Sequence, residues 1–134
     1  MLRLGVHVSV AGGIDQAVSR ACEKGCDAFQ IFSSNPRGWR SSPISPDSAE
    51  RFISSLHGSG LYPAVGHMPY LPNLASSRDE VHAKSVQVLT LELERCRMLG
   101  LAYLVTHLGS HLGAGRQSGL ERIIAALKIA LDGS

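Results

Sequence analysis

Three histidines follow short apolar segments of the chain, in a pattern that could bind a metal ion. His7 ends the segment RLGVH, His67 follows PAVG, and His107 follows YLVT. If these segments are parallel strands, their carboxyl ends lie at one rim, so the three rings could converge. Neutral imidazole suits zinc, which takes about four ligands in proteins. Each histidine could instead be a satisfied core residue, and the spacing alone leaves both interpretations open.

Positive charge gathers in the loops that follow these segments. None of these loops contains an acid before its helix begins, and together they carry Arg37, Arg40, Arg78 and Arg116. The formal net charge is only +2, so the placement of the charge is more informative than its amount. A basic rim suits a polyanion, and helix N-termini at the same rim add N–H donors. A scatter of solvated arginines is the alternative.

Large apolar side chains stand among these arginines. Trp39, the only tryptophan, lies in the loop that carries two of them, and Tyr70 and Leu71 come shortly after His67. Such side chains beside arginines could wedge into a base stack. They could equally fold back and cover the mouth of the fold.

Four successive strand-and-helix units must position these residues. The strands are expected at residues 3–8, 27–32, 62–66 and 102–106, each followed by an amphipathic helix. Connections from helix to strand are short and those from strand to helix are long, as in folds that keep their chemistry at the carboxyl ends of strands. The pattern predicts an α/β fold of the (β/α) TIM-barrel type, here its first four β-α units, forming a half barrel within one domain of residues 1–134.

Capping signals predict where the helices begin. Ser45 before a proline is a good N-cap for the second helix, and S-x-x-E sequences at Ser77 and Ser118 predict capping boxes for the third and fourth. His57 and His82 fall inside helices, where we expect them to be solvated.

The composition indicates a folded protein without membrane spans. Hydrophobic residues make up 44% of the 134 residues, enough for a packed core. Cys22, Cys26 and Cys96 lack metal-type pairing and are interpreted as reduced core thiols. No leader opens the sequence and no apolar run approaches the ~20 residues of a membrane span, so we expect a soluble, cytoplasmic protein with no membrane partner.

Four segments in order resemble the endonuclease IV family of zinc-dependent apurinic/apyrimidinic (AP) endonucleases, within the xylose isomerase-like barrel superfamily. The resemblance extends over nearly the whole chain, and the N-x-R-x-W core of the second segment is quite specific. The segments are GVHVSVAGG at 5–13, FSSNPRGWR at 32–40, GHMPYLPNL at 66–74 and THLGSHL at 106–112.

The resemblance implies roles at a zinc site. His67 and His107 match zinc ligands of a trinuclear site, which is up to three Zn²⁺ ions in a complete barrel. His7 and Ser9 would line the pocket beneath the metals. His111 is considered because of its place in a rim loop, where it could contact a phosphate or have no role at the site. The implied reaction is hydrolysis of the phosphodiester on the 5′ side of an abasic site in duplex DNA, for DNA repair.

The resemblance also implies a DNA-binding surface. Arg37, Tyr70 and Leu71 match residues that enter the DNA and hold it bent, with the abasic nucleotide flipped out. Asn35 would lie along the DNA groove, and Trp39 joins this group because of its place beside the arginines. A nucleotide that lacks its base is cheaper to extrude than a paired one, which helps to select the lesion.

The chain supplies only half of such a barrel, since a complete one needs eight units and about 250 residues. The carboxylate ligands would lie outside it, so we expect the chain alone to be inactive. The missing C-terminal half could belong to the same longer chain, to a separate chain or to a second copy. Without it, an inner face is expected to meet water, built from Val6, Val8, Phe29, Ile31 and Val105.

Two other functions remain open. A metal-dependent sugar isomerase or epimerase would share the barrel and the strand-end histidines, but it has no need of arginines and aromatic rings at the rim. A non-catalytic DNA-binding half-barrel would keep the basic rim without a complete metal site, and its affinity for DNA would depend on salt but not on zinc.

Overall fold

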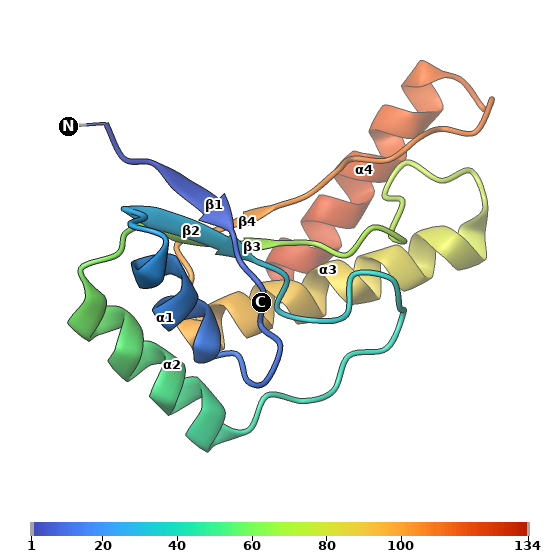
Figure 1. The fold of residues 1–134 in the computed structure, drawn as a ribbon. Coiled ribbons are helices and arrows are strands. Elements are labelled where there is room, and N and C mark those ends of the chain that lie inside the picture. The colour runs from blue at the N-terminus through green and yellow to red at the C-terminus, as the bar shows by residue number, and fades with distance from the viewer. Residues whose placement is uncertain (1, 134) are drawn as a thin grey trace.

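The computed structural model describes residues 2–133, in which helices and strands alternate along the chain (Figure 1). All four strands are parallel and pair in the order β1-β2-β3-β4. The elements are β1 (Gly5–His7), α1 (Gln16–Glu23), β2 (Ala28–Ile31), α2 (Pro46–Ser59), β3 (Ala64–His67), α3 (Asp79–Leu99), β4 (Tyr103–Val105) and α4 (Arg116–Asp132). The predicted half barrel of four β-α units is therefore confirmed, with strands a few residues shorter than expected.

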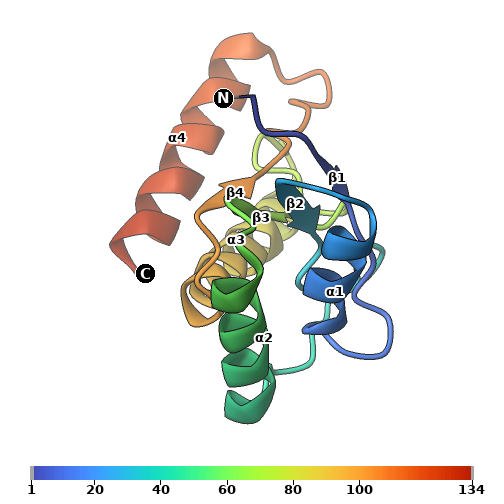
Figure 2. The same cartoon turned by 60° about the vertical axis from the view of Figure 1, so that its left-hand side comes forward.

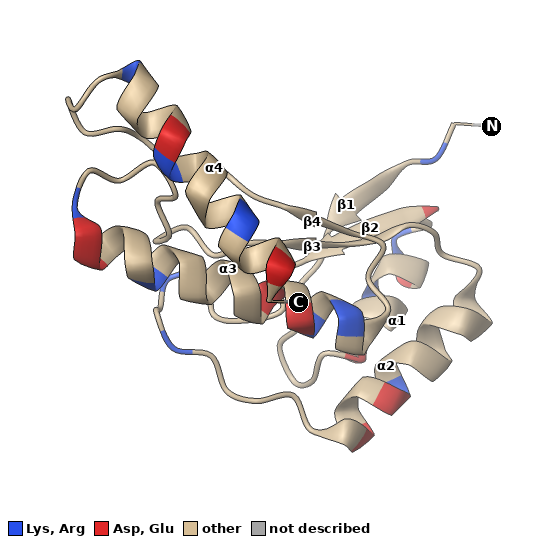
Figure 3. Ribbon diagram, turned by 180° about the vertical axis from the view of Figure 1, so that it is seen from behind, with Lys and Arg blue, Asp and Glu red and all other residues tan. Residues whose placement is uncertain are grey.

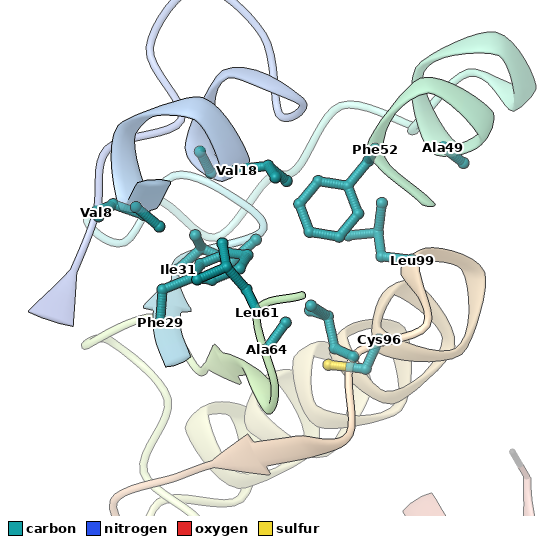
Figure 4. Close-up of a cluster of buried hydrophobic side chains, with 13 residues drawn as sticks. Val8, Val18, Phe29, Ile31, Ala49, Phe52, Leu61, Ala64, Cys96 and Leu99 are labelled. Atoms are coloured by element: carbon teal, nitrogen blue, oxygen red, sulfur yellow. The ribbon is translucent and has the colours of Figure 1, made fainter. Parts of the chain in front are cut away.

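The helices cover one face of the sheet and leave the other open. They form an arc from α1 to α4, in which consecutive helices pack side by side (Figure 2). Between sheet and helices lies the main hydrophobic core, to which Phe29, Ile31 and Phe52 contribute large buried side chains (Figure 4). Burial of this apolar area supplies the principal stabilisation of such a fold.

The predicted composition of the inner face is partly wrong. Val8, Phe29 and Ile31 are buried against the helices, because alternate residues of a strand point to opposite faces and these three fall on the helix side. Gln30 pairs in register with Val65 and lies on the inner face instead. Val105 also lies there and is 42% exposed, as expected of a face that lacks its covering half.

The edges of the sheet are open as predicted. β1 and β4 each pair with one strand only among residues 2–133. Val6 on β1 is 48% exposed, and Tyr103 on β4 is 59% exposed. Unpaired edges and exposed apolar residues are the places where a second half would continue the sheet.

The helix N-termini confirm one capping prediction and contradict two. The Ser45 side chain accepts a hydrogen bond from the Ser48 N–H at the start of α2. The N-cap of α3 is Arg78, whose backbone N–H donates to Ser76 Oγ instead, and the N-cap of α4 is Gly115. Both predicted capping boxes are wrong, since α3 begins after a turn made by Ser76 and α4 begins ahead of the predicted serine.

Two further sequence expectations need correction. His82 is partly buried, with Nε2 3.0 Å from the Arg122 carbonyl oxygen, so it joins α3 to α4, whereas His57 is exposed as expected. Of the three cysteines only Cys96 is fully buried, and Cys22 is exposed. Burial raises the pKa of the Cys96 thiol to about 12. Within residues 2–133 no helix has the length and apolarity needed to cross a bilayer.

Candidate functional site

The three strand-end histidines lie in one aromatic cluster at the carboxyl rim of the sheet. The ring of Phe32, directly after β2, is 4.4 Å from that of His7 and 5.3 Å from that of His67, measured between centroids. The rings of His67 and His107 are 5.2 Å apart, and Tyr70 packs on Phe32 at 5.1 Å. The convergence expected from the parallel sheet is therefore present: Phe32 links His7 to His67, and His67 in turn contacts His107.

Hydrogen bonding fixes which nitrogen of His67 is free. His67 Nδ1 lies 2.7 Å from the Met68 carbonyl oxygen, and a carbonyl only accepts, so Nδ1 carries the proton. The lone pair of neutral His67 is then on Nε2, in the form in which histidine binds a metal ion. His107 is exposed beside it.

His7 and Ser9 are held by their own neighbours. His7 Nδ1 accepts a hydrogen bond from the Gln30 amide at 2.9 Å, and burial, assisted by the nearby charge of His67, lowers the pKa of His7. Ser9 Oγ accepts from the Ala11 N–H at 3.1 Å. Arg20 donates to the Ser9 carbonyl oxygen at 2.8 Å, so the loop after β1 is fixed from the helix behind it.

The loop after β2 presents its large side chains to solvent. Asn35 Oδ1 accepts from the Arg37 N–H at 3.0 Å and closes a tight turn. Trp39 is 39% exposed, while Tyr70 and Leu71 on the next loop are 59% and 41% exposed. Their exposure is compatible with both the wedge and the covering role, and both stay predictions. The Tyr70 N–H donates to the Pro36 carbonyl oxygen at 2.9 Å and joins the two loops.

The rim arginines lack hydrogen-bonded partners within residues 2–133, although Arg78 adds to the effect of Lys84 in lowering the pKa of the Glu80 carboxyl. None of the four guanidinium groups forms a hydrogen bond or ion pair with another described residue, and the same holds for Arg97 in α3. Side-chain bonds are formed by the other five arginines, Arg3, Arg20, Arg51, Arg95 and Arg122. Figure 3 shows blue segments and no red one on the loop between β2 and α2. The free groups are Arg37, Arg40, Arg78 and Arg116.

His111 organises the loop after β4. Its Nδ1 accepts from the N–H groups of Gly113 and Gly115 at 3.2 and 3.3 Å, which leaves Nε2–H as the outward donor of the neutral ring. Gly119 of α4 permits this packing, because a Cβ there would lie 2.9 Å from the Cβ of His111. His111 thus has a structural use, and its exposed edge still faces solvent.

Two polar residues that the sequence analysis missed hold the loop after β2. Glu92 on α3 is 2% exposed and accepts hydrogen bonds from the hydroxyls of Ser33 and Ser34. Arg95, one turn later, donates to the Ser33 and Ser42 carbonyl oxygens. Burial lowers the pKa of Arg95, an effect that the Glu92 carboxylate opposes. One sequence signal was available, since Glu92 falls on the buried stripe of α3, between Leu89 and Cys96.

The chain itself offers an incomplete set of metal ligands. Within the part that the structure describes, no group of three or more His, Cys, Asp or Glu side chains is close enough to bind one ion. The pair formed by His67 and His107 has suitable chemistry for zinc, but zinc in proteins takes about four ligands. Further ligands must come from outside these residues if the pair is to bind a metal ion.

Comparison with known proteins agrees with the parallel half barrel and its strand-end rim. Residues 18–133 match the sequence family described as xylose isomerase-like TIM barrel. The chain belongs to this family. Within the family it is similar to "Probable endonuclease 4" of Cenarchaeum symbiosum, with 56% identity over 131 residues that make up 96% of this chain and 47% of the relative.

Two solved structures resemble this chain to different degrees. Endonuclease IV of Thermus thermophilus is 41% identical with a TM-score of 0.87, and the match covers 98% of this chain and 46% of that one. An L-ribulose 3-epimerase has a TM-score of 0.70 at 19% identity over 99% of this chain and 47% of that one, a likeness of fold alone. The chain spans about half the length of the curated relatives it matches and corresponds to their N-terminal half.

Proposed function

We propose that this chain is half of a zinc-dependent barrel that hydrolyses the phosphodiester 5′ of abasic sites in duplex DNA. The observation that carries the proposal is the placement of two kinds of group at one rim. A pair of imidazoles, His67 and His107, lies at the same rim as the loops that carry the exposed wedge side chains and the arginines without hydrogen-bonded partners. The similarity to proteins named endonuclease 4 supports the same assignment.

The arginines and the wedge residues would bind the DNA. Unpaired guanidinium groups attract phosphates in any duplex, which makes the affinity dependent on salt. Tyr70 and Leu71, together with Arg37, would enter the stack, and Trp39 and Asn35 belong to the same surface. A site that lacks its base costs less to open, so insertion favours the lesion over intact duplex.

The two imidazoles would hold part of the metal site. His67 offers Nε2 because its Nδ1–H is engaged by the Met68 carbonyl, and His107 would bind beside it. His7 and Ser9 would line the floor of the pocket beneath the metals, and His111 would offer Nε2–H to a phosphate from the adjoining loop. Bound zinc ions would activate water and neutralise charge on the scissile phosphate.

The remaining ligands would come from the second half of the barrel. That half would pair with the edges of β1 and β4 and cover the inner face around Tyr103 and Val105. The simplest source is a longer chain that contains these residues as its N-terminal half. A separate chain or a second copy are the other sources.

The deciding experiment measures zinc content and cleavage of an abasic-site duplex, for this chain and for a version extended to full barrel length. We expect cleavage and about three zinc ions only in the extended version. Zinc-independent, salt-sensitive binding of DNA without cleavage in both would replace the proposal with a DNA-binding half-barrel. Turnover of sugars by the extended version, without cleavage of DNA, would replace it with an epimerase or isomerase.

A further inference from the structure

The loop that carries Arg37 and Trp39 has no secondary structure of its own. It runs from Phe32, after β2, to Ser45, before α2. On the side toward β1 it borders a cavity of about 710 Å³ lined in part by His7 and Ser9. At its two ends the loop is packed through Phe32 and Ile44. Between these ends a pocket borders it, so the position of the middle of the loop depends on a small number of polar contacts.

The first of these contacts is a buried carboxylate. Both oxygens of Glu92 accept hydrogen bonds from hydroxyl groups, Oε2 from Ser33 and Oε1 from Ser34, each at 2.5 Å. Glu92 is 2% exposed and Ser33 5% exposed, so the bonds are shielded from water. A buried carboxylate is costly unless it is fully hydrogen-bonded, and the two serines at the base of the loop meet that need.

The second contact joins the two ends of the loop. Arg95 Nε donates to Ser33 Oγ at 2.9 Å and Nη1 donates to the Ser42 carbonyl oxygen at 2.8 Å, while Nη2 donates to the Ser33 carbonyl oxygen. One planar guanidinium group therefore spans the start and the end of the loop. Glu92 Oε1 lies 3.9 Å from Arg95 Nε and balances its charge.

We propose that Glu92 and Arg95 are positioning residues that fix the loop of residues 33–42 and thereby set the place of Arg37 and Trp39 at the rim. The tip of the loop is tied to the neighbouring loop through the Tyr70 N–H and the Pro36 carbonyl, so a shift at the base moves the tip relative to Tyr70. That a displaced loop would weaken binding to DNA rests on the proposed function. That Glu92 and Arg95 hold the loop in place does not.

The test uses Trp39, the only tryptophan of the chain, as a reporter inside the loop. Arg95→Lys keeps the positive charge for Glu92 but cannot reach three acceptors with one planar group. Arg97→Lys is the matched control, because Arg97 lies on the same helix and is exposed. Acrylamide quenching of Trp39 is measured at 25 °C, and far-UV circular dichroism gives the thermal midpoint of each variant.

Arg95→Lys is expected to raise the quenching constant by up to about 2.5-fold, the ratio between a fully exposed tryptophan residue and one that is 39% exposed. Arg97→Lys is expected to leave quenching unchanged. If Arg95→Lys does not fold, Ser34→Ala carries the same test, since it removes one donor to Glu92 and leaves Arg95 in place. A lower thermal midpoint with unchanged quenching in the folded variant would overturn the proposal, because Arg95 would then only stabilise the fold.

A parallel titration with a labelled abasic duplex separates this proposal from the proposed function. Weaker binding by Arg95→Lys, together with increased quenching, is the result expected if both hold. If the protein without substitutions binds no duplex even when it is extended to barrel length, the proposed function is refuted. The quenching comparison would still decide whether Glu92 and Arg95 position the loop.

Discussion

Asn73 joins the loop after β3 to the loop after β4, and a single glycine makes this possible. Its side-chain amide donates to the Ser110 carbonyl oxygen at 3.0 Å, and its Oδ1 accepts from the N–H groups of Ser110 and Ala75 at 2.9 and 3.1 Å. Gly109 lies against this amide with φ of +93°, and a Cβ there would stand 2.0 Å from Asn73 Oδ1. Gly109→Ala should therefore separate the two loops.

The magnitude follows from two contributions. A side chain at positive φ costs about 1–2 kcal/mol. Displacing Asn73 also breaks its paired hydrogen bonds to Ser110, worth about 1 kcal/mol each. Gly113→Ala is the matched control, because Gly113 in the same loop has φ of +86° but no atom within 4 Å of the position that the added methyl group would take. Gly109→Ala should cost about 3–4 kcal/mol and Gly113→Ala about 1–2 kcal/mol.

Urea unfolding of the two variants and the parent measures the difference directly. We expect Gly109→Ala to be less stable than Gly113→Ala by about 2 kcal/mol, the value of the lost Asn73–Ser110 pair. Equal losses of stability in the two variants would refute the reasoning. They would show that backbone strain is the whole effect and that the bridge between the loops contributes no stability.

Three further predictions concern other parts of the chain. Arg37→Ala should weaken binding to abasic duplex more than to intact duplex in the barrel-length protein, measured by titration at fixed salt, and equal losses would indicate plain phosphate attraction. Ser45→Ala should lower the free energy of unfolding by about 1 kcal/mol because α2 loses its N-cap, whereas the exposed Ser54→Ala in the same helix should cost much less in the same urea titration. At pH 8 a thiol reagent should modify exposed Cys22 while Cys96, buried and with a pKa raised to about 12, reacts only on unfolding; early reaction of both would contradict the packing of β3 against α3.

The open inner face links the stability of the chain to its function. Tyr103 and Val105 belong to a surface that, in a closed barrel, would be the interior, and the proposed metal pair stands at the carboxyl end of that surface. One event, the docking of a second half, would thus bury apolar area and bring new ligands to His67 and His107. Folding and metal binding should therefore be coupled in the complete protein.

The sequence by itself determined the fold class and the side of the sheet on which the site lies. Alternating apolar segments and glycine-ended helices specify β-α units, and parallel strands send their carboxyl ends to one rim. That geometry follows from chain direction alone, so the convergence of His7, His67 and His107 could be predicted without coordinates.

Only the tertiary structure decided which face of each strand is buried. Phe29 and Ile31 were predicted on the inner face but lie against the helices. In a short strand with apolar residues on both faces, the sequence has no alternation that tells the buried face from the open one. Which face is buried depends on the register with neighbouring strands.

The polar contacts that hold the rim loops also required the tertiary structure. Glu92 meets Ser33 and Ser34 across 59 and 58 residues of sequence, and an acid on a helix normally indicates a solvated face. His82 was likewise expected in solvent, but α4 packs against it and the Arg122 carbonyl oxygen lies within hydrogen-bonding distance of its ring. Local sequence records the charge of a side chain, but the partner that compensates for its burial is brought to it by the packing of distant elements.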